Sequence, residues 1–302
     1  MWGSPQSNPP SALVNAPLTT AHRALKADPM PRGFLSQDLL SDFDPVAVIL
    51  SPPRCGSTVL ARSLWQHRAF RWYLHEPCDR AYHLGPSPEP EPNIPIDRGG
   101  HSSPGLTGTG IVIKEMTFQA GDAISDLQVA TTVPAIFLIR DPRLAVLSRM
   151  RRRKLDGDIP SFPAKEAGWR DQLAAIALFR EAGTPYVIVD ISDIRRSPDT
   201  ALRALCSRLS LPWDPAMLRW KSLPDLRLGN IGGSQDAWYV RVLGSTAWER
   251  PNERMPSPDA FRKQGMSAVV AECLAGYRQV RADPQYLGIG EPTLMSFEGW
   301  EI

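Results

Sequence analysis

The chain has 302 residues, of which 42% are hydrophobic and 22% charged, values of an ordinary globular protein, and its formal net charge of +2 predicts no general affinity for nucleic acid or a membrane surface. The four cysteines are widely spaced and form no C-x-x-C pair, the N-terminus lacks a secretory signal pattern, and no apolar run reaches membrane-spanning length. We therefore expect a soluble cytoplasmic protein without a membrane span, in which any anion binding is local.

Proline and glycine mark the organisation that we expect along the chain. Residues 1–44 contain several prolines and little periodicity, which predicts a loosely structured leader. Residues 45–302 are predicted to form a single domain. Residues 84–110 form a Pro/Gly-rich insertion, and a long segment of this kind is usually a lid or a binding loop. A shorter break at residues 156–163 is expected to help shape the same pocket.

Short apolar runs alternate with helical patterns between these breaks. Strands are predicted at residues 46–50, 72–74, 111–113, 135–139 and 186–189, and helices at residues 59–65, 169–179 and, after Ser197-Pro198, 202–209. Continuous apolar strands between amphipathic helices predict an α/β fold with a central parallel sheet flanked by helices on both faces. Ligands of such sheets bind at the carboxyl ends of the strands.

The loop S-P-P-R-C-G-S-T at residues 51–58 follows the first predicted strand and resembles a phosphate-binding loop. Gly56 and Thr58 match that motif, whereas Ser57 stands where its lysine should be. Since that lysine reaches the β and γ phosphates of a nucleoside triphosphate, γ-phosphoryl transfer is disfavoured. Backbone N–H groups, the two hydroxyls and the Arg54 guanidinium still suit a single phosphate. The alternative is a strand-to-helix turn without a ligand.

Cys55 suggests a cysteine phosphatase as a rival interpretation, because a helix N-terminus favours a thiolate. Such enzymes close the loop with an arginine at C-x5-R spacing. Here the next arginine is Arg62, after six intervening residues and already inside the predicted helix. We therefore interpret Cys55 as a small loop residue.

A second anion pocket is predicted where Arg140 ends the strand at residues 135–139. Asp141 and Pro142 are suited to starting a helix, which places Ser148 and Arg152 four residues apart on one helical face. Arg140 needs a partner because it ends an apolar strand. A solvated basic helix surface is the better interpretation for four other residues of this segment, namely Arg149, Arg151, Arg153 and Lys154.

Together, P-R-C-G-S-T at residues 53–58 and R-D-P-R-L-A-V-L-S at residues 140–148 resemble the two signatures of sulfotransferases that use 3′-phosphoadenosine 5′-phosphosulfate (PAPS). The resemblance is to bacterial-type members, with some similarity to tyrosylprotein sulfotransferases, and extends loosely over residues 45–255. It implies a P-loop NTPase-like sulfotransferase fold, with PAPS as cofactor, adenosine 3′,5′-bisphosphate as product and no metal.

The same resemblance implies roles for individual residues. The 5′-phosphate would be held by the first loop, namely by Arg54, Cys55, Gly56, Ser57 and Thr58. Arg140 and Ser148 would hold the 3′-phosphate, and Arg152 stands where tyrosylprotein sulfotransferases place a further arginine for it. Arg250 is a candidate for the cation that closes over the nucleotide, although the R-K-G triplet of the cytosolic enzymes is absent.

The implied reaction is in-line transfer of a sulfuryl group to a hydroxyl or amine of a small-molecule acceptor. Arg54 would stabilise charge on the leaving 5′-phosphate. Glu76 is the preferred base and His75 the second choice; a glutamate serves well near neutrality only if burial raises its pKa. Lys114 either contacts the bridging oxygen or sulfonate, or points to solvent. Glu76 could instead simply pair with an arginine.

Other interpretations stay open from the sequence alone. His75, Cys78, His83 and His101 fit no standard zinc spacing, so no metal is expected. Trp238 and Trp248 could line an acceptor pocket or belong to the core. An ATP-dependent phosphotransferase of P-loop fold and a non-catalytic nucleotide-binding module are the two rival functions. Neither the acceptor nor the oligomeric state can be predicted.

Overall fold

The computed structural model describes residues 40–85, 96–97, 109–228, 231, 235–251 and 254–289. Most of the predicted leader at residues 1–44 and most of the insertion at residues 84–110 lie outside the described residues. Both boundaries therefore stay predictions. Among the described helices, none is long and apolar enough to cross a membrane.

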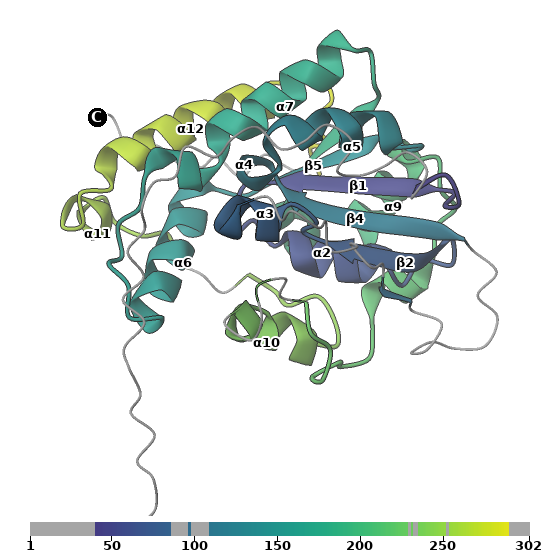
Figure 1. Ribbon diagram of the computed structural model, residues 1–302, viewed down its shortest axis with the longest axis horizontal. Helices are drawn as coiled ribbons and strands as arrows, with labels where there is room; N and C mark the ends of the chain where they lie inside the picture. The colour runs from purple at the N-terminus through teal and green to yellow at the C-terminus, as the bar shows by residue number, and fades with distance from the viewer. Residues whose placement is uncertain are drawn as a thin grey trace, which may run out of the picture.

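The described part of the chain contains a central sheet of six strands in the order β3-β2-β4-β1-β5-β6 (Figure 1). Neighbouring strands run parallel except for the short edge strand β3, which is antiparallel to β2 and lies inside the predicted insertion. The bounds are β1 Val46–Ser51, β2 Phe70–His75, β3 Ile96–Asp97, β4 Gly110–Met116, β5 Ala135–Ile139 and β6 Tyr186–Asp190. The predicted α/β fold with a helix-covered sheet is confirmed.

Helices cover both faces of the sheet, and each face has its own apolar core because side chains alternate along a strand. The core that contains Val48 and Phe137 packs against α5 (Ile124–Ala130), α7 (Trp169–Glu181) and α12 (Ser267–Arg281). The opposite core, with Ile49 and Leu138, packs against α2 (Ser57–Leu64) and α9 (Pro198–Arg208). The sheet's central strands are thus buried on both sides, which explains their uninterrupted apolar sequences.

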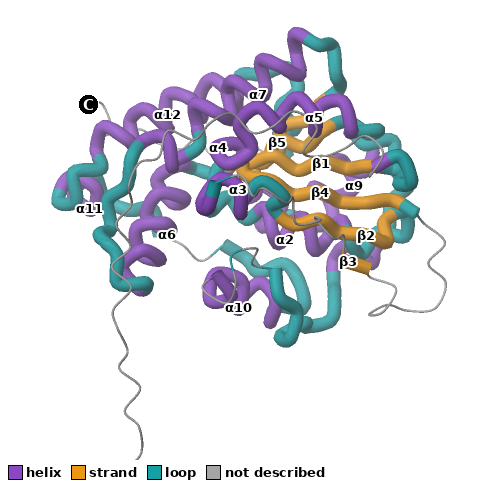
Figure 2. The backbone as a smooth tube through the Cα atoms, in the orientation of Figure 1, coloured by secondary structure: helices purple, strands orange, loops and turns teal. Residues whose placement is uncertain are grey.

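The remaining helices, all of them short except α6, gather around the carboxyl ends of the strands (Figures 1 and 2). They are α3 (Asp79–Leu84), α4 (Thr117–Ala120), α6 (Pro142–Leu155), α8 (Ile191–Arg196) and α10 (Asp236–Gly244), while α11 (Asp259–Arg262) precedes α12. Asp141 caps α6 as expected, since its side chain accepts a hydrogen bond from the Arg143 N–H at 2.9 Å. The binding edge of the sheet is therefore built from loops and short helices.

Four strands extend beyond their predicted ends, β1 and β6 by one residue each. β2 includes His75 and β4 continues through Lys114 and Glu115, all of which are buried. The prediction stopped at residue 113 because the next side chains are charged. In the fold these charged side chains find partners at the ligand edge, so the strand need not end where the polar residues begin.

Candidate active site

The loop between β1 and α2 adopts a tight left-handed path. Gly56 has φ 83°, and a Cβ there would lie 3.0 Å from Ile191 Cγ1, so glycine is needed for both its conformation and its size. Arg54 also has a positive φ, of 63°, which is uncommon for a residue with a side chain. This backbone places the start of α2 at the carboxyl edge of the sheet.

The two sequence motifs meet at Arg54. Its Nε donates a hydrogen bond to Ser148 Oγ at 3.2 Å, and Arg140 Nη1 donates one to the Arg54 carbonyl at 2.9 Å. The first loop, the end of β5 and the first half of α6 therefore form one continuous structure. The fold thus brings together two motifs that lie far apart in the sequence.

A cavity of about 220 Å³ opens beside this structure, bounded by the loop, the ends of β2 and β4, and α6, α8 and α10. Its lining is cationic. Two glutamates, Glu76 and Glu249, face five arginines and one lysine, namely Arg54, Lys114, Arg140, Arg149, Arg195 and Arg241. Such a lining suits a ligand that carries several negative charges.

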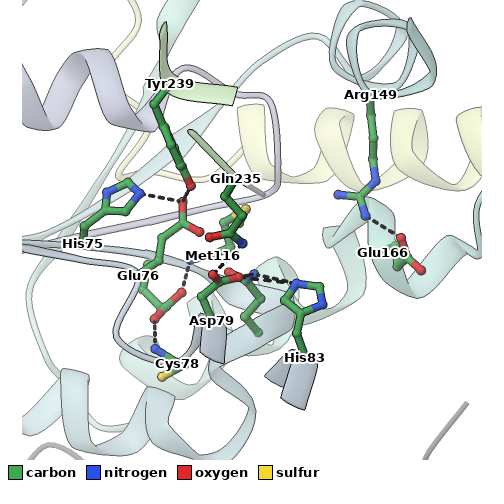
Figure 3. Close-up of polar contacts among 12 residues, drawn as sticks. His75, Glu76, Cys78, Asp79, His83, Met116, Arg149, Glu166, Gln235 and Tyr239 are labelled. Atoms are coloured by element: carbon green, nitrogen blue, oxygen red, sulfur yellow. Dashed lines mark hydrogen bonds and ion pairs between the residues drawn. The ribbon is translucent and has the colours of Figure 1, made fainter. Parts of the chain in front are cut away.

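Glu76 lines the cavity and belongs to a buried polar cluster (Figure 3). Its Oε1 accepts a short hydrogen bond from Lys114 Nζ and lies 3.4 Å from the Tyr239 hydroxyl. Burial, the largest single effect, would raise the pKa of Glu76, but the charge of Lys114, together with His75 and the hydrogen bonds from Lys114 and Tyr239, makes the net shift downward. Glu76 is thus an ionised carboxylate held by a lysine.

His75 lies behind Glu76 and does not line the cavity. Its Nε2 is 3.5 Å from Glu76 Oε1, and its Nδ1 shares a hydrogen bond with the Tyr73 hydroxyl. Burial lowers the pKa of His75 to about 3 despite the neighbouring carboxylate, so the ring is neutral. The described geometry therefore favours Glu76 over His75 as the group that meets a ligand.

The turn after β2 is held by the buried carboxyl group of Glu115. Its oxygens accept hydrogen bonds from the backbone N–H groups of Cys78 and Met116, each at 2.7 Å. Burial, with the nearby charge of Glu76, raises the pKa of Glu115 to about 8. Because Glu76 itself has φ 42°, these contacts fix a strained turn in place.

Helix α10 forms the outer wall of the cavity. The Trp238 ring contacts two guanidinium groups, with the Cζ atoms of Arg54 and Arg152 each 5.5 Å from its centroid. At the other end of α10, the buried Arg62 donates to the carbonyls of Val242 and Leu243, and to Lys221. Arginines thus attach this helix to α2 and α6.

Three of the predicted cofactor-binding residues do not present a free polar group to the cavity. Cys55 is fully buried and burial raises the pKa of its thiol to about 12, as expected of a small loop residue. Arg152 reaches the cavity only through Trp238, since its guanidinium binds Asp156 and the Ala237 carbonyl. Arg250 is exposed and does not line the cavity.

Sequence reasoning missed several lining residues. Arg149 was assigned to the solvated face of its helix, yet it is 8% exposed and lines the cavity. Its only sequence signal is its place directly after Ser148. Arg195 and Arg241 also line the cavity, and no motif marks them. Within the described ranges, no group of three or more His, Cys, Asp or Glu residues could hold a metal ion.

Individual known proteins resemble only parts of this chain or its general architecture. Over 94 residues this chain is 32% identical to branched-chain-amino-acid aminotransferase-like protein 1 of Arabidopsis thaliana. The matched stretch is 31% of this chain and 16% of that protein, so this chain spans only a small part of that relative. A sulfotransferase from Alicyclobacillus acidocaldarius has 14% identity and a TM-score of 0.45 over 79% of this chain and 96% of its own. The sulfotransferase domain of the curacin biosynthetic pathway has 19% identity and a TM-score of 0.43 over 76% and 96%.

The sequence profile of the sulfotransferase domain matches residues 114–276, more than half of the chain. The matched range includes Lys114, Arg140 and Ser148, although it begins after the first loop. Both TM-scores lie below 0.5, so the assignment rests on this profile. This chain belongs to the sulfotransferase domain family.

Proposed function

We propose that the protein transfers a sulfuryl group from PAPS to a hydroxyl or amine of a small-molecule acceptor. The observation that carries the proposal is the contact of both motifs at Arg54, beside a cavity with a cationic lining. We infer a cytoplasmic location as well, a proposal supported by four cysteines that are all unpaired.

The residues at the cavity fit the nucleotide that the family uses. The N–H groups of the first loop, the start of α2 and the hydroxyls of Ser57 and Thr58 would hold the 5′-phosphate. Arg140 and Ser148 would hold the 3′-phosphate. Arg152 would have to leave Asp156 to contact the nucleotide directly, and otherwise would act on it only through Trp238. Arg250 would have to turn inward. Both stay proposed cofactor residues.

PAPS, when bound, supplies a sulfuryl group whose departure leaves negative charge on the 5′-phosphate. Arg54 would stabilise that charge. Glu76 would accept the proton of the acceptor, whose oxygen or nitrogen bonds to sulfur as the bond to the bridging oxygen breaks. A carboxylate with a lowered pKa is a weak base, so we infer that Lys114 turns from Glu76 toward the bridging oxygen or sulfonate. That movement would raise the pKa of Glu76.

Calorimetric titration with adenosine 3′,5′-bisphosphate and with adenosine 5′-phosphate tests the proposal. Arg140→Ala should weaken bisphosphate binding by about tenfold or more, because a charge-assisted contact to the 3′-phosphate is lost, and should affect the monophosphate much less. An equal loss for both nucleotides would contradict the 3′-phosphate site. Stabilisation by ATP with magnesium, but not by the bisphosphate, would favour a phosphotransferase.

A direct assay separates an enzyme from a binding module. With a panel of phenols, alcohols and amines as acceptors, PAPS labelled with ³⁵S should yield a labelled product. Glu76→Gln should abolish turnover, since it removes the proton acceptor, while bisphosphate binding persists. A non-catalytic module would bind the bisphosphate and yield no labelled product with any acceptor.

A further inference from the structure

Arg149 is a buried cation at the cavity that the proposed reaction does not use. It lies on α6 directly after Ser148, is 8% exposed and lines the cavity. Figure 3 shows its guanidinium bound to Glu166, away from the cluster around Glu76. A buried guanidinium is costly unless its charge and its donors are satisfied.

The charge of Arg149 is only partly compensated. Glu166 binds Nη2 of Arg149 but also lies 3.9 Å from Arg153 Nη1, so one carboxylate serves two guanidinium groups. Among the described residues, the buried Nε of Arg149 has no hydrogen-bond partner. Since a guanidinium carries five N–H donors, Arg149 retains capacity for another acceptor.

Aromatic rings hold the guanidinium in place. Its Cζ lies 4.9 Å from the centroid of Phe162 and 5.6 Å from that of Phe118. Phe118 also packs edge-on against Tyr82. These rings desolvate the cation and restrict its rotamers, and burial lowers the pKa of Arg149. An anion that meets it there would bind strongly, because little water competes.

Arg149 and the proposed base Glu76 line the same cavity. Arg54, Arg140 and Ser148 gather at the ends of β1 and β5. Phe118, which contacts the Arg149 guanidinium, lies in α4 directly after β4, and β4 carries the Lys114 that pairs with Glu76. An acceptor that reaches Glu76 would therefore enter the cavity that Arg149 also lines.

We propose that Arg149 selects the acceptor, and that the acceptor carries an anionic group, such as a carboxylate, in addition to its reacting hydroxyl or amine. This inference rests on the proposed function. Phe118 and Phe162 would contact the apolar part of the same molecule. Glu166 would act as a competitor that holds Arg149 until the anion arrives.

Matched pairs of small molecules test this inference without turnover. The full chain is saturated with adenosine 3′,5′-bisphosphate and titrated calorimetrically with 4-hydroxyphenylacetate or its amide, and with 3-hydroxybutyrate or its amide. We expect the carboxylate of at least one pair to bind about tenfold or more tightly than its amide, the magnitude of one hydrogen bond to a charged group. Arg149→Gln should abolish this preference.

Three further variants sharpen the result. Arg149→Lys keeps the charge and should retain part of the preference, which guards against a folding defect in Arg149→Gln. Glu166→Gln should increase the preference because it removes the competing carboxylate. Arg151→Gln, on the exposed face of the same helix, should leave it unchanged.

Equal binding of acids and amides by the wild type, including no binding of either, would overturn the inference. So would a preference that survives Arg149→Gln, or an Arg149→Gln variant that loses bisphosphate affinity as Arg140→Ala does, since Arg149 would then belong to the nucleotide site. A wild type that fails to bind the bisphosphate would instead overturn the proposed function itself.

Discussion

Lys114→Met should destabilise the protein by about 3–5 kcal/mol at pH 7, the usual loss when one partner of a buried ion pair is removed. The side chains of Lys114 and Glu76 are each 2% exposed, so water cannot replace the lost partner. Methionine preserves most of the volume, and the loss is therefore electrostatic. The second contact of Glu76 Oε1, with Tyr239 at 3.4 Å, is too long to compensate.

The loss should depend on pH in a defined direction. In the wild type, the folded pKa of Glu76 lies below its ordinary value of 4.5, so its stabilisation is present above pH 4.5 and is lost as the pH falls through the folded pKa. In Lys114→Met the opposing charge of the lysine is gone and burial dominates over the smaller effects of His75 and Tyr239, so the folded pKa rises above 4.5. The variant then loses stability as the pH increases beyond 4.5, and the difference from wild type widens toward neutrality.

Urea unfolding followed by circular dichroism at about pH 4.5 and pH 7 measures both effects. The double variant Glu76→Gln with Lys114→Met should recover most of the loss, since no charge is left unpaired. Arg203→Met is the control because its pair with Asp199 is about half exposed, which predicts a loss of at most about 1 kcal/mol. A Lys114→Met loss below about 1 kcal/mol, or one equal at both pH values, refutes this reasoning.

Three other predictions concern the structure around the cavity. Arg62→Met should increase amide hydrogen exchange across α10 and leave α9 unchanged, because Arg62 holds the carbonyls at the end of α10; unchanged exchange in α10 would contradict that role. Cys55 should resist iodoacetamide at pH 8, as read by mass spectrometry, since burial raises its pKa to about 12. Burial raises the folded pKa of Glu115 to about 8, so its deprotonation opposes folding and wild-type stability should fall between about pH 5 and 8. Glu115→Gln should remove this fall. Denaturant titrations in which the variant's unfolding free energy declines with pH as steeply as that of the wild type would exclude this.

The sheet and the loop after its first strand could be predicted because their signals are local. Strands β1 and β5 are apolar runs, and the loop with Gly56 and the Asp141-Pro142 start of α6 have defined backbone requirements. The short strand β3 could not be predicted. Its two residues, Ile96 and Asp97, form a strand only through pairing with β2 and have no periodic pattern of their own.

Side-chain partners depend on which elements lie next to each other, and this explains the remaining differences. Arg149 looks like one of several solvated arginines on α6, but helix α4 and residue Phe162 cover it in the fold. Glu76 was expected to need a raised pKa for its role as a base. The adjacent strand β4 brings Lys114 to it and lowers that pKa instead. Neither contact has a signature in a single sequence.

The absence of lysine from the first loop has a physical counterpart in β4. Ser57 stands at the lysine position of the loop, and the cavity receives a buried ammonium group from Lys114 on the neighbouring strand. A lysine in the loop would be committed to phosphate, whereas Lys114 already pairs with Glu76. If Lys114 left Glu76 for the bound PAPS, the arrival of PAPS would free Glu76 to act as the base. The same lysine would then serve stability before binding and catalysis afterwards, which is why Lys114 should matter more than a single phosphate contact.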